Sequence, residues 1–317
     1  MIVTLTANPS IDHTVMLSGP LRRGEVLRAR ATSSQPGGKG VNISGAAYVA
    51  GVPTRAVIPC PDLDPMVAEL RAAGLDVVTV GPAGRPRINT TVTEPDGTTT
   101  KLNGPGATAT SALLDALAAR LVEEAEEAGW VVLAGSLPPG APAGWYAEVV
   151  SALRATDARI AVDTSDAPLE ALAAGLPAGA PDLLKPNAEE LASITGAHSL
   201  TDPVAAAMAA RTLVDRGVAG VLATLGGNGA VLVTADGSWH ATPPPTDVVS
   251  TVGAGDSSLF GYLLAELRGL SAPERLALAV AYGSAAAGLP GTTLPTPPQV
   301  RADLVSVRGL DPITGGL

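Results

Sequence analysis

The chain has 317 residues, of which 46% are hydrophobic and 16% are charged, so it can bury a large core and is unlike a disordered chain. Its formal net charge of −10 argues against an extended phosphate backbone or an anionic membrane as a partner, and we therefore expect no nucleic acid and no membrane. The single cysteine, Cys60, excludes an intrachain disulfide, and the opening MIVTLTANPS is unlike a secretory signal. The expected location is the cytoplasm.

Short apolar runs typical of buried strands alternate with alanine- and leucine-rich helical patterns. The strand-like runs are 1–7, 130–135, 159–163, 182–185 and 220–226, and the clearest helical patterns are 110–128, 142–155 and 203–216. This alternation predicts an α/β fold with a mostly parallel sheet and helices on both faces, formed by one domain over 1–317. Ligands of such sheets bind beyond the carboxyl ends of the strands, where the glycine-rich turns of this chain fall.

Two segments interrupt the alternation. Residues 13–36 and 86–104 are rich in threonine, valine and charged residues, and the second contains a PDG turn signal. They predict antiparallel strands and hairpins that form a small β lid over the ligand edge of the sheet. The alternative is a pair of ordinary surface hairpins.

The stretch TVGAGDS, 251–257, precedes a helical pattern. Two glycines let the backbone approach a ligand closely, and a helix start presents free N–H groups to an anion. An aspartate beside an anion is expected where a proton must be accepted, so Asp256 is a candidate base in phosphate chemistry. The alternative is that Asp256 only caps the helix.

A second glycine cluster, PGGKGVN, spans 36–42. Its glycines permit close backbone approach, Lys39 adds a positive charge, and Asn42 can bind a hydroxyl. Only three of the 20 basic residues are lysines, and a lysine is not interchangeable with an arginine, so Lys39 and Lys185 are candidates for functional positions. A glycine turn that leads into a core helix is the alternative for this cluster.

Three further stretches carry candidate polar groups. Asp12 follows the first strand and can accept hydrogen bonds from substrate hydroxyls, while Arg87 on the lid can clamp a phosphate. Asn187 and Glu190 share a helical face and can organise hydrated Mg²⁺, although the same spacing is typical of a helix cap. The turn 224–230 suits a nucleotide lying against bare backbone, or a tight hairpin.

In their order along the chain, TANPSID, GGKGVN, GSLPPG, KPNAEE, TLGGNGA, TVGAGDS and YGSAAAGLPGT together resemble the ribokinase-like carbohydrate kinases of the PfkB family. The resemblance covers nearly the whole chain. The stretches NPSID, PGGKGVN, RINTTVTEPDG and DVVSTVGAGDS are most similar to the branch that acts on phosphorylated ketohexoses. The resemblance therefore implies a ribokinase-like fold and ATP-dependent phosphorylation of a sugar phosphate.

The resemblance also implies roles for individual residues. Asp256 would be the catalytic base, beside an anion hole formed by Gly253, Ala254 and Gly255. The substrate would be held by Asp12, Gly37, Gly38, Lys39, Asn42, Arg87 and Ser136. ATP would be contacted by Lys185, Thr224, Gly226, Gly229 and Ser284, and Mg²⁺ by Asn187 and Glu190. Since some relatives bind a monovalent cation beside the anion hole, K⁺ is a candidate further cofactor.

The leading expectation for the reaction is conversion of fructose 1-phosphate to fructose 1,6-bisphosphate. The alternatives are tagatose 6-phosphate or fructose 6-phosphate as substrate, a neutral sugar or nucleoside, and a non-catalytic sugar-binding relative. A lysine in the glycine loop together with Arg87 favours a phosphorylated sugar over a neutral one. The expected partners are the phosphosugar and ATP, and the resemblance implies a homodimer formed through the β lid.

Overall fold

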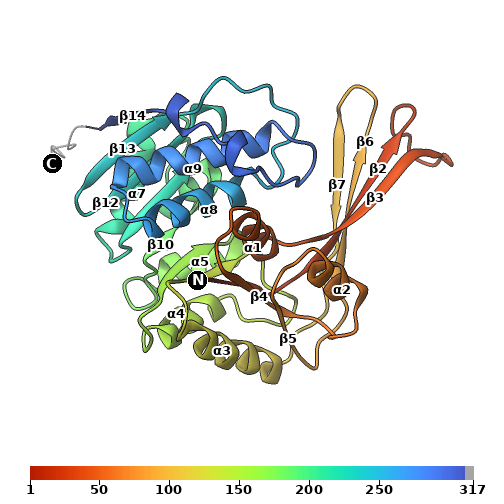
Figure 1. The fold of residues 1–317 in the computed structure, drawn as a ribbon, viewed down its shortest axis with the longest axis horizontal. Helices are drawn as coiled ribbons and strands as arrows, with labels where there is room; N and C mark the ends of the chain where they lie inside the picture. The colour runs from red at the N-terminus through yellow and green to blue at the C-terminus, as the bar shows by residue number, and fades with distance from the viewer. Residues whose placement is uncertain (311–317) are drawn as a thin grey trace.

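Two sheets organise residues 1–310, the part of the chain that this computed structural model describes (Figure 1). The strands are β1 Ile2–Thr6, β2 Ser10–Leu17, β3 Ala29–Gly37, β4 Thr54–Pro59, β5 Val77–Val80, β6 Arg87–Thr93, β7 Thr99–Asn103, β8 Trp130–Ala134, β9 Arg159–Asp163, β10 Leu183–Leu184, β11 Gly220–Thr224, β12 Ala230–Thr234, β13 Gly237–Thr242 and β14 Ser306–Gly309. The helices are α1 Lys39–Val49, α2 Pro65–Ala72, α3 Ser111–Ala125, α4 Trp145–Leu153, α5 Asp166–Ala174, α6 Ala188–Thr195, α7 Pro203–Val214, α8 Ala254–Leu267 and α9 Ala272–Ala287. Short 3-10 turns are η1 Gly226–Asn228, η2 Pro297–Gln299 and η3 Ala302–Leu304.

The large sheet has the strand order β14-β13-β12-β11-β10-β9-β8-β1-β4-β5. From β5 to β11 all neighbours pair in parallel, whereas β11 to β14 pair antiparallel. The mostly parallel α/β sheet predicted from the sequence is thus confirmed. Because parallel strands all end at the same edge, the turns after β1, β8, β9 and β10 gather there.

Each face of the large sheet has its own apolar core, because successive side chains of a strand point to opposite faces. In β8, Val131 and Leu133 pack with helices α3 to α7, whereas Val132 packs with α1, α8 and α9 on the other face. Figure 1 shows α8 and α9 side by side on their face of the sheet. The strand ends are therefore fixed from both sides, which gives the loops at that edge a rigid base.

The small sheet, which we call the lid, has the strand order β3-β2-β6-β7 and projects from the main body (Figure 1). The β2–β3 and β6–β7 pairs are antiparallel, as expected, but the central pair, β2 with β6, is parallel, so the expectation of antiparallel strands alone was wrong there. Turn signals specify only the pairing within a hairpin, and they carry no information on how two hairpins join. The first lid strand also begins at Ser10, earlier than position 13, and so includes Asp12.

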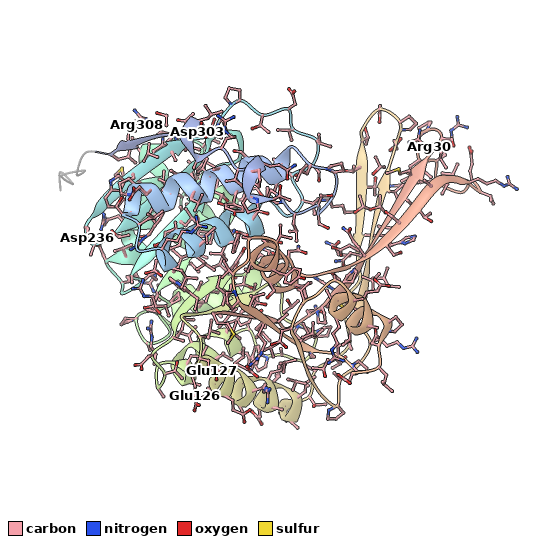
Figure 2. All side chains as sticks on the ribbon, viewed as in Figure 1. Arg30, Glu126, Glu127, Asp236, Asp303 and Arg308 are labelled. Atoms are coloured by element: carbon pink, nitrogen blue, oxygen red, sulfur yellow. The ribbon has the colours of Figure 1, made fainter. Side chains whose placement is uncertain are left out.

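Exposed charged side chains stand both on the lid and far from it (Figure 2). Arg30 stands on the lid, in a segment with the exposed Arg22, Arg23 and Arg28, whereas Glu126 and Glu127 follow α3 at the opposite end of the molecule.

No helix within residues 1–310 is long and apolar enough to cross a membrane. The cytoplasmic location expected from the sequence stays a prediction.

Candidate active site

A cavity of about 1140 Å³ lies where the lid, α1, the start of α8 and the β11–β12 turn face one another. It collects polar side chains and glycines that are far apart in the sequence. The predicted site residues along its wall are Asp12, Gly38, Lys39, Asn42, Arg87, Lys185, Asn187, Glu190, Thr224, Gly226, Gly229, Gly253, Ala254, Gly255, Asp256 and Ser284. The fold therefore brings nearly all the residues singled out from the sequence into one place.

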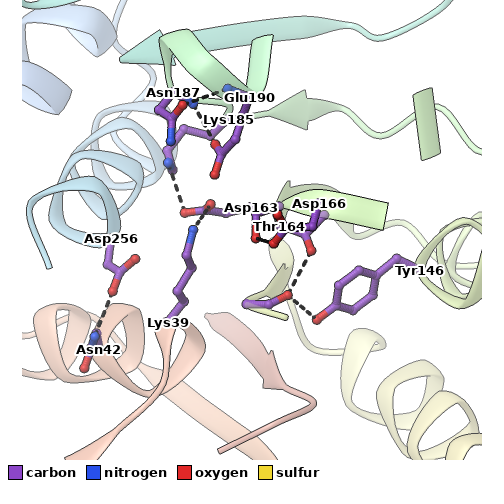
Figure 3. A network of polar contacts seen from close by, with 12 residues as sticks. Lys39, Asn42, Tyr146, Asp163, Thr164, Asp166, Lys185, Asn187, Glu190 and Asp256 are labelled. Atoms are coloured by element: carbon purple, nitrogen blue, oxygen red, sulfur yellow. Dashed lines mark hydrogen bonds and ion pairs between the residues drawn. The ribbon is translucent and has the colours of Figure 1, made fainter. Parts of the chain in front are cut away.

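Two of the predicted residues, Gly37 and Ser136, are not part of the cavity wall. Gly37 lies behind Asp12, where a Cβ atom would come within 2.3 Å of the Asp12 carboxylate. Ser136 follows β8, and its Oγ is buried without a hydrogen-bond partner among the described residues. The carbonyl just before it, that of Gly135, accepts hydrogen bonds from the hydroxyls of Tyr146 (3.0 Å) and Thr164 (2.9 Å) (Figure 3). The roles of Gly37 and Ser136 as substrate contacts stay predictions.

The helix expected after TVGAGDS is present as α8, and its start lies in this stretch. Gly253 is the N-cap residue, with φ of 78° in the left-handed region that favours glycine. The first N–H groups of a helix lack partners within it and carry a partial positive charge, so they favour an anion placed against them. Asp256 sits in this first turn and is 7% exposed. It is therefore held beside these N–H groups and lines the cavity.

Asp256 has a surrounding that suits proton transfer. Burial raises the pKa of Asp256 above its usual value, and the nearby charge of Asp163 acts in the same direction. The positive charge of Lys39 and a hydrogen bond of 2.7 Å from Asn42 Nδ2 oppose this rise without cancelling it (Figure 3). A carboxylate with a raised pKa is a stronger base, which is the property a catalytic base needs.

Two lysines meet on one buried carboxylate at the centre of the site. Asp163 ends β9 and is fully buried; Lys39 Nζ lies 2.5 Å from its Oδ1, and Lys185 Nζ lies 3.1 Å from its Oδ2 (Figure 3). A Cβ atom at Gly255 would lie only 3.4 Å from Lys185 Nζ, so this lysine borders the start of α8. Asp163 thus connects the glycine loop of α1 with the lysine after β10.

The charges of this group stabilise one another. Burial alone would raise the pKa of Asp163, but Lys185 and Lys39 outweigh it and hold that pKa below its usual value. Burial likewise opposes the charged form of Lys39, yet attraction to Asp163 and Asp256 raises its pKa. The charged form of Lys39 is therefore favoured, and its ammonium lies where phosphates are expected.

Sequence reasoning missed Asp163, although it identified the strand 159–163 that the residue ends. A polar residue at the carboxyl end of a buried parallel strand is the available signal, since ligands bind at this edge. The signal is weak because aspartates are also common in ordinary turns. The partners Lys39 and Lys185 lie in other segments of the chain, and only the folded structure joins them.

On the lid side of the cavity, Asp12 is held by two donors. Its Oδ1 accepts hydrogen bonds from Ser10 Oγ (2.9 Å) and Asn89 Nδ2 (3.0 Å). Arg87 donates from Nη1 to the carbonyl of Gly104 at 3.3 Å, and its buried Nε has no partner within residues 1–310. Burial lowers the pKa of the Arg87 guanidinium from its usual value. Ser10 and Asn89 also line the cavity and were not singled out from the sequence.

Asn187 and Glu190 form the helix cap that was the alternative reading, and they also face the cavity. Asn187 Oδ1 accepts from the Glu190 N–H at 2.8 Å, and Glu190 Oε2 accepts from the Asn187 N–H at 2.8 Å. This capping box starts α6 and leaves Glu190 Oε1 outside it. One feature thus fixes the geometry of the helix start and presents a carboxylate oxygen to the site.

The turn after β11 is a hairpin, as one reading expected, and it also lines the cavity. Gly226–Asn228 form a 3-10 turn, and the Leu225 N–H donates to the Gly229 carbonyl at 2.7 Å. Thr224 forms a bridge with Asn187, which joins this turn to the start of α6. Ser284 lies across the cavity on α9. This end offers backbone, small side chains and few charges.

We expect Asn42→Ala to move the acid limb of the pH profile of kcat/KM to higher pH. The hydrogen bond from Asn42 favours ionised Asp256, so its loss raises the pKa of Asp256 further, and a smaller fraction of the enzyme carries the base at each acidic pH. Rates of the wild type and the variant across pH 5 to 9, with the same substrates, check this. An acid limb at an unchanged pH would contradict it.

Residues 5–299 match the pfkB family of carbohydrate kinases. The chain belongs to this family. Among curated proteins, the 1-phosphofructokinase of Rhodobacter capsulatus is 37% identical over 318 residues, which cover 98% of this chain and 99% of that relative. The carbohydrate kinase expected from the sequence motifs is thereby confirmed, and the match extends over nearly the whole of both chains.

Several solved structures share the architecture of this chain. Escherichia coli phosphofructokinase-2 in complex with substrates and products matches with a TM-score of 0.87 and 32% identity, over 96% of this chain and 99% of that one. The same enzyme in complex with potassium matches with a TM-score of 0.86 and 30% identity, over 95% and 96% of the two chains. Arabidopsis thaliana ribokinase, at 22% identity and a TM-score of 0.72 over 92% and 96%, shares the fold. The expected ribokinase-like fold is confirmed.

Proposed function

We propose that this protein transfers the γ-phosphoryl group of ATP to fructose 1-phosphate and forms fructose 1,6-bisphosphate. The observation that supports the chemistry is Asp256, buried with a raised pKa at the start of α8, with Asn42 and two lysines around it. The choice of sugar follows the relative named 1-phosphofructokinase, which matches along nearly the whole chain.

In the proposed reaction the free primary hydroxyl of the sugar attacks the γ-phosphorus. Its oxygen forms the new P–O bond, the bond from the γ-phosphorus to the bridging oxygen of ADP breaks, and Asp256 takes the hydroxyl proton. The N–H groups of Gly253, Ala254 and Gly255 would donate to the oxygens of the transferring group. Phosphoryl transfer depends mainly on positioning and charge neutralisation, and a base near the nucleophile completes it.

The positive side chains divide between the two substrates in this proposal. Arg87 on the lid and Lys39 on the glycine loop would hold the phosphate that the sugar already carries. Lys185, beside Gly255, would approach the phosphates of ATP. Thr224, Gly226, Gly229 and Ser284 would contact the nucleotide. Asp12 and Asn42 would bind sugar hydroxyls.

Mg²⁺ is proposed as a cofactor bound through water. Within residues 1–310 no group of three or more His, Cys, Asp or Glu side chains could hold a metal directly. Mg²⁺ keeps several waters and is commonly bound by one or two carboxylates together with substrate phosphates. Glu190 fits this mode because its Oε1 lies outside the capping box and can accept from a metal-bound water. Asn187 Oδ1 already accepts from the Glu190 N–H and its Nδ2 can only donate, so the metal role of Asn187 stays a prediction. When bound, the metal would neutralise phosphate charge.

K⁺ is proposed only from the potassium complex of E. coli phosphofructokinase-2.

The test of this function is an ADP-release assay with Mg-ATP and four acceptors. We expect kcat/KM to be highest for fructose 1-phosphate, above fructose 6-phosphate, tagatose 6-phosphate and unphosphorylated fructose, because Lys39 and Arg87 offer charge to a phosphorylated sugar. Preference for another phosphosugar would overturn the substrate assignment and retain the chemistry. Turnover of unphosphorylated fructose alone, or of none of the four, would overturn the proposal.

We also propose that two copies of the chain pair through the lid. On one face of it, Ile88 is 60% exposed and Leu102 is 61% exposed, which leaves apolar surface open to water. We expect sedimentation equilibrium at micromolar concentration to give a dimer for the wild type and a monomer for Ile88→Glu, which places a charge in the interface. A monomeric wild type would contradict this arrangement.

A further inference from the structure

The lid turns a row of polar side chains toward the cavity. In the parallel pair β2–β6, Asp12 lies opposite Asn89 and Ser10 lies opposite Arg87, and all four line the cavity. The intervening Ile88 points to the other face, because side chains alternate along a strand. Asn89 is thus placed by two strands and belongs to the same wall as the proposed sugar contacts.

Asn89 has a fixed orientation with one unused group. Its Nδ2 donates to Asp12 Oδ1 at 3.0 Å, and since a carboxylate can only accept, the amide cannot be turned the other way round. The other end, Asn89 Oδ1, is buried and has no hydrogen-bond partner in the described part of the chain. A buried acceptor without a donor is costly, so this atom is suited to a donor that arrives from outside the folded chain.

Asp12 provides a second acceptor beside it. The two donors to this carboxylate, Ser10 Oγ and Asn89 Nδ2, both bind Oδ1, so the Oδ2 atom is left for another donor. Two oxygens that can only accept would repel a phosphate, whereas the hydroxyls of a sugar can donate to them. Arg87, two residues before Asn89 on the same face of β6, is the group on this wall that suits a phosphate.

We infer that Asn89 determines sugar specificity by accepting a hydrogen bond from one hydroxyl of the phosphosugar through Oδ1, while Asp12 accepts from a neighbouring hydroxyl through Oδ2. This inference rests on the proposed function. A site built to bind a hydroxyl discriminates strongly against an analogue that lacks it, because its own polar group is then left unpaired. Asn89 would therefore select among sugars by the position of a hydroxyl, independently of where they carry phosphate.

The test compares fructose 1-phosphate with its 3-deoxy and 4-deoxy analogues on the wild type and on Asn89→Ala. For one analogue we expect the wild type to lose about 10- to 100-fold in kcat/KM, which is of the order that a lost hydrogen bond to a buried group produces. Asn89→Ala should lose a comparable factor on the parent sugar and no more than about twofold further on that analogue, since the partner is already missing. Its KM for ATP should match the wild type, which shows that the rest of the site is intact.

Asn103→Ala is the matched control, because Asn103 pairs with Asn89 in the next strand but is exposed and does not line the cavity. It should respond to both analogues as the wild type does. The inference is wrong if the wild type keeps its kcat/KM within twofold on both analogues. It is also wrong if the loss in kcat/KM caused by Asn89→Ala and the loss caused by the analogue simply multiply. If the wild type prefers another phosphosugar, the proposed function fails separately, and the same comparison with the deoxy analogues of that sugar decides the role of Asn89.

Discussion

Replacing Asp256 with asparagine should lower kcat by about 10²- to 10⁴-fold, the usual contribution of a general base, with the KM values for ATP and sugar changed only a few-fold. The amide has nearly the same shape, and its oxygen can still accept from Asn42 Nδ2, so the start of α8 should keep its geometry. It cannot take the proton of the attacking hydroxyl. Steady-state kinetics with both substrates varied measure the loss of kcat and the KM values. Calorimetric titration of ADP measures nucleotide binding separately.

Asp236→Asn is the control for this change, because Asp236 is exposed in the turn between β12 and β13, away from the cavity (Figure 2). It removes the same charge and should leave kcat within about twofold, as surface substitutions usually have small effects. Turnover of Asp256→Asn close to that of the wild type would show that the carboxylate is not the catalytic base. The alternative that Asp256 caps α8 is already disfavoured, because Gly253 is the N-cap residue and no side chain caps this helix start.

The sequence predicted the large sheet well because its signals are local. Buried parallel strands are short apolar runs and the helices between them are alanine-rich, so 130–135, 159–163 and 203–216 were recognised without knowledge of their neighbours. The helix start at 251–257 could be predicted equally well, since the bend, the free N–H groups and the aspartate all lie within one turn of helix. Features contained in one segment could be predicted from it.

The residues that were missed depend on contacts between distant segments. Asn89 gains its place from the β2–β6 pair, whose hydrogen bond to Asp12 spans 77 positions of the chain, and no hairpin signal specifies a parallel pair. Asp163 reaches Lys39 across 124 positions. A strand pattern shows which side chains share a face, but only the pairing of strands shows what that face meets.

Asp163→Asn should lower the free energy of unfolding by about 3–5 kcal/mol, the usual cost of removing one partner from a buried ion pair. Lys185, whose side chain is 4% exposed, loses its counter-charge, whereas Lys39 is 35% exposed and can still reach water. Urea unfolding at pH 7 measures the loss. Asp303→Asn is the control, since the Arg301–Asp303 pair is exposed on both sides and exposed ion pairs add little to stability.

The same variant tests why two lysines share one carboxylate. In the proposed reaction Lys185 approaches the phosphates of ATP, so ATP or ADP should supply to Lys185 the negative charge that Asp163→Asn removes. We expect nucleotide to raise the unfolding temperature of the variant more than that of the wild type. The lysines hold the pKa of Asp163 below its ordinary 3.8. The ionised carboxylate therefore stabilises the folded protein above that pH, and this stabilisation is lost as the pH falls through the lower pKa of the folded state. The stability difference between the two proteins should therefore narrow in acid. Equal nucleotide stabilisation of both proteins would mean that Asp163 supports the fold without serving the phosphate site.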